Sequence, residues 1–86
     1  MAEVHLPVTL PPLFPGLPRR LDVEAASVGE ALERLERRWP GLRDRVCEGG
    51  ELRPHIRVFV DGERAALDTP LAADARLDVI AAISGG

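Results

Sequence analysis

The sequence contains no lysine, because all eleven of its basic residues are arginine. No side-chain amine is therefore present for Schiff-base chemistry or for attachment of one copy to another, which leaves only the N-terminal amine. A single cysteine, Cys47, excludes an internal disulfide and fits a reducing compartment. These shortages exclude several kinds of covalent chemistry from the side chains.

The sequence also lacks an excess of positive charge, with eleven basic and fourteen acidic residues. The net charge of −3 argues against a nucleic-acid partner, and the sequence shows no basic stripe for a membrane surface. No run of residues is long and apolar enough to span a bilayer, and the first ten residues lack the basic start and apolar core of a signal peptide. We therefore expect a cytoplasmic protein without nucleic-acid or membrane partners.

The length of 86 residues allows one small domain, and a hydrophobic content of 45% supports a single modest core. Such a core leaves little room for a catalytic cleft. Size therefore favours a binding or carrier module over an enzyme that acts alone.

The first third of the sequence predicts a β-hairpin. Residues 3–10 alternate apolar and polar side chains, which is typical of a half-buried strand. Pro7 cannot donate to a strand ladder, so we expect this strand to be an edge there or to be irregular. Residues 11–20 hold four prolines and a glycine and predict a loop, which a short strand over residues 21–24 follows.

The clearest predicted element is a helix that begins after Ser27. Ser27 and Glu30 have the spacing of a capping box, and an apolar stripe at helical spacing ends at Trp39. Pro40 and Gly41 end the helix, and residues 42–46 suggest a further short turn of helix. We expect Trp39 to close the end of the core.

The second half predicts three more strands. Residues 55–60 form a strong strand, Asp61 and Gly62 form a two-residue hairpin turn, and residues 63–66 return. Residues 76–80 form the last strand. One helix cannot cover both faces of this sheet, so the fold class is α+β: a β-grasp (ubiquitin-like) fold with a mixed four- to five-stranded sheet and one main helix on one face. We expect a domain over residues 1–83 and a flexible tail over residues 84–86.

The tail is the most informative segment. Ile83 and Ser84 precede Gly85 and Gly86, which have no Cβ and fit a channel too narrow for side chains. One interpretation is that the tail enters a partner's active site, where the Gly86 carboxylate is activated. The other is an ordinary frayed end.

The alternation of the strands also predicts a docking face. If Val58 and Val60 face the helix, Arg57 and Phe59 face solvent, and the same parity places Ile80 and His5 beside them. Exposed apolar side chains together suggest a docking patch with Phe59 and Arg57 as the main contacts. The alternative is scattered exposed residues, which are common.

Three segments resemble a known family: SVGEALERLERRWPGLRDRV at residues 27–46, LRPHIRVFVDGE at 52–63 and DTPLAADARLDVIAAISGG at 68–86. They are similar to the bacterial ubiquitin-like sulfur carriers MoaD, the small subunit of molybdopterin synthase, and ThiS, the thiazole carrier. The resemblance is weakest over residues 11–20. The length and the segment 39–53 resemble MoaD more than the shorter ThiS. Two features depart from MoaD: residues 81–84 read AAIS where a proline-rich approach is common, and the first strand lacks aromatic residues.

The resemblance implies that the protein binds no cofactor and is not catalytic by itself, although it could be the sulfur-carrying subunit of a sulfurtransferase. A MoeB/ThiF-like activating enzyme would use ATP to adenylate Gly86, and a sulfur donor would convert it to a thiocarboxylate. Ile83, Ser84 and Gly85 would occupy the partner's tunnel. The acceptor would be an enzyme such as a molybdopterin synthase large subunit.

Other interpretations stay open. Thiazole or cysteine synthesis could receive the sulfur, the tail could be conjugated to proteins, or the Phe59 face could define a plain interaction module. His5 and His55 have no metal-ligand spacing around them, so we expect no metal site. No lysine or helix N-terminus activates Cys47, so we expect a packing residue.

Overall fold

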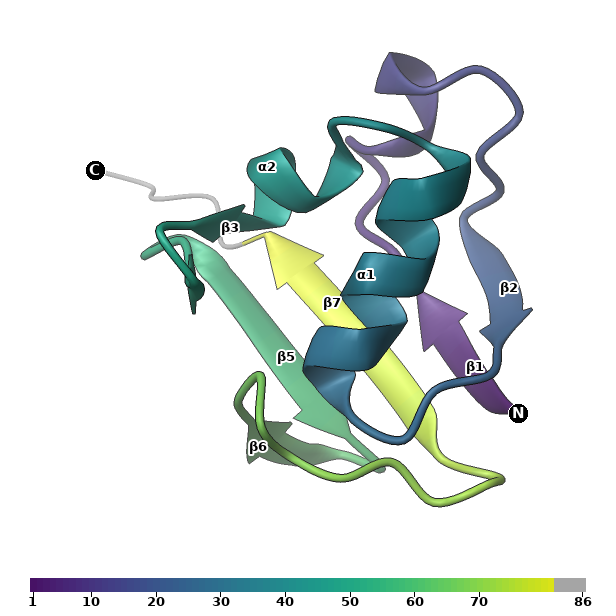
Figure 1. Cartoon of the computed structure of the whole chain (residues 1–86), viewed down its shortest axis with the longest axis vertical. Helices are drawn as coiled ribbons and strands as arrows, with labels where there is room; N and C mark the ends of the chain where they lie inside the picture. Colours follow the sequence, from purple (N-terminus) through teal and green to yellow (C-terminus); the bar gives the residue numbers. More distant parts are fainter. Residues whose placement is uncertain (82–86) are drawn as a thin grey trace.

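The computed structural model describes residues 1–81, which form a five-stranded mixed sheet with a helix across one face (Figure 1). The strand order is β2-β1-β7-β5-β6. Strands β1 and β7 are parallel, and every other pair in this sheet is antiparallel. The strands are β1 (Ala2–His5), β2 (Arg20–Val23), β5 (Ile56–Val60), β6 (Glu63–Ala65) and β7 (Arg76–Ala81). The β-grasp prediction is confirmed.

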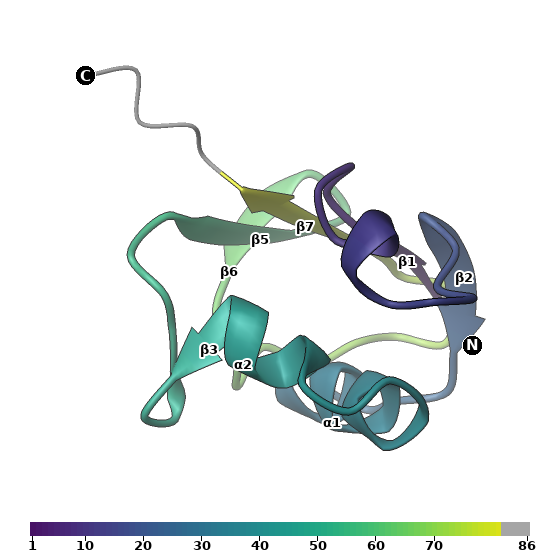
Figure 2. The same ribbon diagram turned by 90° about the horizontal axis from the view of Figure 1, so that it is seen from above.

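Helix α1 (Val28–Arg38) covers a single face of the sheet, as the view from above shows (Figure 2). Its N-terminus is capped by Ser27, whose hydroxyl oxygen accepts a hydrogen bond from the Glu30 backbone N–H at 3.2 Å. The helix begins where predicted, and its four buried residues lie on one stripe: Val28, Ala31, Leu32 and Leu35.

The core lies between this helix and the inner face of the sheet. The side chains that meet there come from α1 and from alternate positions of β1, β5 and β7, where Val4, Val58 and Leu77 have no exposed surface. Trp39 is buried at the end of the helix, where its indole N–H donates to the Pro15 carbonyl at 3.3 Å. Trp39 therefore closes the core, as expected.

The first strand is shorter than predicted, and of the two expectations for Pro7 the irregularity is confirmed and the edge position is wrong. Strand β1 ends at His5, and it lies between β2 and β7 instead of at an edge. The ladder continues only to the Leu6 N–H, which donates to the Arg19 carbonyl at 2.8 Å. On the other side of β1, the Glu3 N–H donates to the Ala75 carbonyl beside β7, and by the same alternation position 7 faces β7. Pro7 has no N–H for a rung there, so the chain turns away and enters the short 3-10 helix η1 (Pro11–Leu13).

The segment after α1 is more ordered than predicted. Helix α2 (Leu42–Val46) is followed by the two-residue strands β3 (Cys47–Glu48) and β4 (Glu51–Leu52), which pair around Gly49-Gly50. Both glycines have positive φ, which a tight turn requires and L-residues avoid. The sequence gives no strand signal there, because two-residue strands are too short to show alternation.

Candidate functional site: the end of strand β7 and the outer face of the sheet

The predicted tail residues Ile83, Ser84, Gly85 and Gly86 lie outside the described residues, as does the predicted domain boundary at residue 83. The structure describes the strand that leads to them. Strand β7 is the middle strand of the five, and Leu77 and Val79 are buried beneath it. The strand that precedes the tail is therefore held in the centre of the sheet.

The two edges of β7 differ. Along β5, pairing extends from Leu77 opposite Val60 to Ala81 opposite Ile56. Along β1, the register covers only Arg76 to Asp78, because β1 ends at His5. Within residues 1–81, the last half of β7 therefore has a strand neighbour on one side alone. An unpaired edge of this kind can accept an extended segment of another chain.

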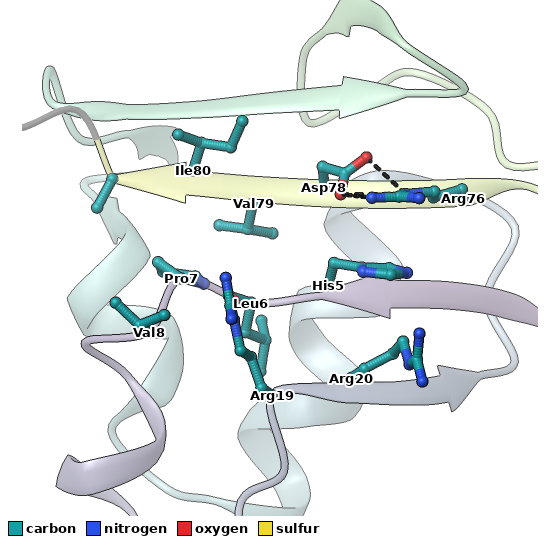
Figure 3. Close-up of a pocket in the computed structure, with 11 residues that line it drawn as sticks. His5, Leu6, Pro7, Val8, Arg19, Arg20, Arg76, Asp78, Val79 and Ile80 are labelled. Atoms are coloured by element: carbon teal, nitrogen blue, oxygen red, sulfur yellow. Dashed lines mark hydrogen bonds and ion pairs between the residues drawn. The ribbon is translucent and has the colours of Figure 1, made fainter.

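A hollow of about 700 Å³ lies where β1 turns away from this edge (Figure 3). Its apolar wall includes Val8 and Ile80, which are 60% and 45% exposed. Arg19 and Arg20 lie on the side of β2. The hollow thus combines exposed apolar surface with positive charge at the end of β7 from which the tail departs.

The strand register brings the predicted docking residues onto one face. Phe59 lies opposite Asp78 on β7, and Asp78 lies opposite His5 on β1. Ile80 pairs with Arg57 in the next row toward the tail. The four residues therefore share the outer face of the sheet, away from α1.

The exposure of these four residues corrects the prediction in part. Ile80 is exposed, whereas Phe59, Arg57 and His5 are half-buried. The Arg57 guanidinium donates hydrogen bonds to the carbonyls of Pro54 and Ile56, so it folds back over its own strand. Long side chains on a sheet cover their neighbours in this way, which strict alternation does not predict.

His5 lies near the carboxylate of Glu3. Its Nε2 atom lies 3.1 Å from Glu3 Oε1, a distance within ion-pair range, but the two atoms do not have hydrogen-bond geometry. Arg20 Nε is 3.9 Å from the same oxygen. His5 therefore belongs to a small polar group on the outer face, and the described residues hold no cluster suited to a metal ion.

Arg76 and Asp78 form the best-defined ion pair of the outer face. The Arg76 Nε and Nη2 atoms donate to the carboxylate oxygens of Asp78 at 3.0–3.2 Å. These hydrogen bonds and the charge of Asp78 raise the pKa of Arg76. This pair was not predicted from the sequence, although two opposite charges two residues apart in a predicted strand lie on the same face.

Cys47 is buried, with 3% of its surface exposed, and burial raises the pKa of its thiol. The thiol is therefore protonated and shielded at neutral pH, as expected for a packing residue. No helix within residues 1–81 has the length and apolar character needed to cross a membrane.

The family model described as "ThiS family" matches residues 13–86, from the end of η1 to the final glycine. The chain belongs to the ThiS family. This is a family of ubiquitin-like sulfur carriers and modifiers, so the resemblance drawn from the sequence is confirmed at that level.

Known proteins similar to this ThiS-family chain are consistent with this assignment. It is 44% identical over 69 residues to small archaeal modifier protein 1 of Haloferax volcanii, a match covering 78% of this chain and 79% of the relative. The crystal structure of SAMP1 from the same organism has a TM-score of 0.70 at 37% identity and covers 99% and 98% of the two chains. A chain in the crystal structure of the Amycolatopsis orientalis BexX/CysO complex has a TM-score of 0.89 at 23% identity, with both chains fully covered, and shows the shared fold.

Proposed function

We propose that this ThiS-family chain carries sulfur on Gly86. In the first step a Gly86 carboxylate oxygen attacks the α-phosphorus of ATP in an activating enzyme, and pyrophosphate leaves. In the second step the terminal sulfur of a donor persulfide attacks the carbonyl carbon, and AMP leaves with the bonding electrons. A thiol then attacks the donor-side sulfur of the resulting acyl disulfide, which releases the thiocarboxylate on Gly86 and leaves a disulfide. The protein uses no cofactor of its own. Family membership together with the Gly-Gly end after β7 is the observation that carries the proposal.

The arrangement of β7 supports this function. A sulfur carrier must present its last residues away from its own core while its body stays folded. Ala81 is the last described residue of the central strand, and five residues follow it in the sequence. Five extended residues span about 17 Å, enough to bring Gly86 into a neighbouring enzyme while the β-grasp body remains outside.

The outer face supplies the second part of the proposal. Phe59, Ile80 and His5, with Arg57 beside them, would contact the activating enzyme and the acceptor. The hollow and the unpaired edge of β7 lie on the path from this face to the tail. A partner bound there would meet apolar surface and arginine side chains, so we expect its contact surface to combine apolar and acidic side chains.

Molybdopterin synthesis is the pathway we propose, because the segment over residues 39–53 resembles MoaD and here forms α2 with the β3–β4 hairpin. The activating partner would then be MoeB/ThiF-like, and the acceptor would resemble a molybdopterin synthase large subunit. Cysteine or thiazole synthesis is a second destination. The relatives named small archaeal modifier proteins favour a further candidate, in which the same activated tail is joined to other proteins.

Intact-mass analysis of the protein from its native host tests the proposal, with a Cys47→Ser variant to remove the single thiol. The expected result is a mass rise of one oxygen-to-sulfur exchange, which a thiol-reactive alkylator traps and hydrolysis removes. A variant without Gly85 and Gly86 should show no such species and should unfold at the same urea concentration. An unmodified mass after incubation with host lysate, ATP and a sulfur donor would contradict sulfur carriage. Adducts of higher mass would favour conjugation.

A further inference from the structure

The folded domain of a sulfur carrier, and that of any neighbouring copy, lies close to the activated tail. An acyl adenylate reacts with amines and thiols, so any such group on another copy competes with the sulfur donor. We propose that the side chains of this protein are inert toward acyl transfer, so that copies do not join through them and, apart from the N-terminal amine, the acyl group passes only to a nucleophile of another kind of molecule. This inference rests on the proposed activation of Gly86.

The basic side chains are the first reason. All eleven are guanidinium groups, which stay protonated at neutral pH and have no lone pair to attack a carbonyl. Eight of them are exposed and are therefore open to the tail of another copy: Arg19, Arg20, Arg34, Arg37, Arg38, Arg45, Arg64 and Arg76. A lysine at these positions would be an amine acceptor, as lysine is in proteins joined by isopeptide bonds.

The contacts of the fold do not require a guanidinium group at every one of these positions. Arg76 makes a bidentate pair with Asp78, which a lysine could not reproduce. Arg37 on α1 and Arg64 on β6 differ, because within residues 1–81 their side chains take part in no hydrogen bond or ion pair. These two positions therefore allow lysine to be introduced without disturbing a contact of the fold.

Within residues 1–81, the remaining nucleophiles are shielded or unactivated. Cys47 is the first residue of β3 and is buried in the hydrophobic core, so another copy's tail cannot reach its thiol in the folded state. The Ser27 hydroxyl caps α1, Thr69 Oγ1 accepts from the Ala66 N–H at 2.9 Å, and Thr9 is an exposed hydroxyl. Hydroxyl groups without an adjacent general base are weak nucleophiles. Attack by the His5 or His55 imidazole gives an acyl-imidazole, which water hydrolyses to the original carboxylate.

The test uses the full chain carrying an active ester at the Gly86 carboxyl, with the N-terminal amine acetylated so that only side chains can react. The ester is made chemically, so the result does not depend on whether the host activates the tail. The native sequence is compared with Arg37→Lys and Arg64→Lys at millimolar concentration, and covalent dimers are quantified by denaturing electrophoresis and intact mass. In each linkage the lysine amine would attack the carbonyl carbon, the ester alcohol would leave, and one proton would go to solvent.

We expect the native sequence to be hydrolysed and to stay monomeric, whereas either lysine variant forms dimers about tenfold or more faster. Peptide mapping should place the new amide on the introduced lysine. Dimer formation by the native sequence at the rate of the lysine variants would overturn the inference. So would the absence of dimers in both folded lysine variants while a small added amine still consumes the ester, because the choice of arginine would then make no difference.

Discussion

The two faces of the sheet carry different kinds of side chain, although the same strands form both. On the inner face, Val4, Val58 and Leu77 are fully buried under α1. On the outer face, the equivalent strands present His5, Phe59 and Asp78 in one row across the sheet. The inner face is uniform because water exclusion is its only requirement, whereas the outer face mixes charge, half-buried rings and exposed apolar groups. This difference indicates that the inner face stabilises the fold and the outer face is available for recognition.

The largest expected effect is on the inner face. Leu32 of α1 is fully buried, so Leu32→Ala removes buried methyl groups and leaves a cavity. We expect a loss of about 3 kcal/mol in the free energy of unfolding, which urea denaturation measures. In a domain of this size such a loss is a large part of the total stability. The fraction that stays folded should still accept sulfur at the normal rate, and a change in that rate would show that the two faces are not independent.

The second expected effect is on the outer face. Phe59→Ala should raise the carrier concentration at half-maximal thiocarboxylate formation in host lysate by about tenfold, as for a central aromatic contact. Its cost in the free energy of unfolding should be smaller than that of Leu32→Ala, since Phe59 is only half-buried. Leu13→Ala, an exposed apolar change on η1 outside the sheet, is the matched control and should alter neither quantity. An unchanged half-maximal concentration for Phe59→Ala would remove this residue from the docking face.

The difference between the two faces also explains why the inner face could be predicted from the sequence and the details of the outer face could not. Alternation in β5 and β7 and the 3.6-residue period of α1 identify the inner face, because burial selects one class of side chain at a fixed spacing. The outer face has no such rule. The half-burial of Phe59 and the folded-back Arg57 depend on neighbours from other strands, which a single sequence does not show.

The early end of β1 could be predicted from the sequence only in part. Pro7 gave the position of the irregularity, and the missing N–H is the physical reason for it. The hollow beside β7 depends in addition on how the loop through η1 returns to Arg20, which is a tertiary arrangement. The sequence therefore located the irregularity without revealing the hollow that it produces.

A third prediction concerns a polar group on the helix side. The Glu36 carboxylate accepts hydrogen bonds from the backbone N–H groups of Gly41 and Arg43 at 2.9 and 2.8 Å and so holds the start of α2. These bonds lower the pKa of Glu36 below its ordinary value of 4.5. Glu36→Gln should cost about 1 kcal/mol in the free energy of unfolding at neutral pH.

The pH dependence gives the sign of this effect. Because the folded protein holds the Glu36 carboxylate in its charged form, its contribution is complete above the ordinary pKa of 4.5 and is lost as the pH falls through the lower folded pKa. The stability gap between native protein and Glu36→Gln in urea should therefore close on acidification below that value. A gap that stays constant to lower pH would show that the variant acts through packing instead of charge.

The smallest expected effect on stability comes from the Arg76–Asp78 ion pair on the outer face. Asp78 and Arg76 form a good bidentate pair, yet Arg76 is exposed, and pairs of this kind contribute little to stability because water solvates the separated charges almost as well. Asp78→Asn should therefore leave the melting temperature nearly unchanged. It frees the charge of Arg76 on the proposed docking face, so thiocarboxylate formation in host lysate should become more sensitive to salt if the partner surface is acidic. A large fall in melting temperature would mean that this ion pair stabilises the sheet itself, and the functional division between its two faces would then not hold.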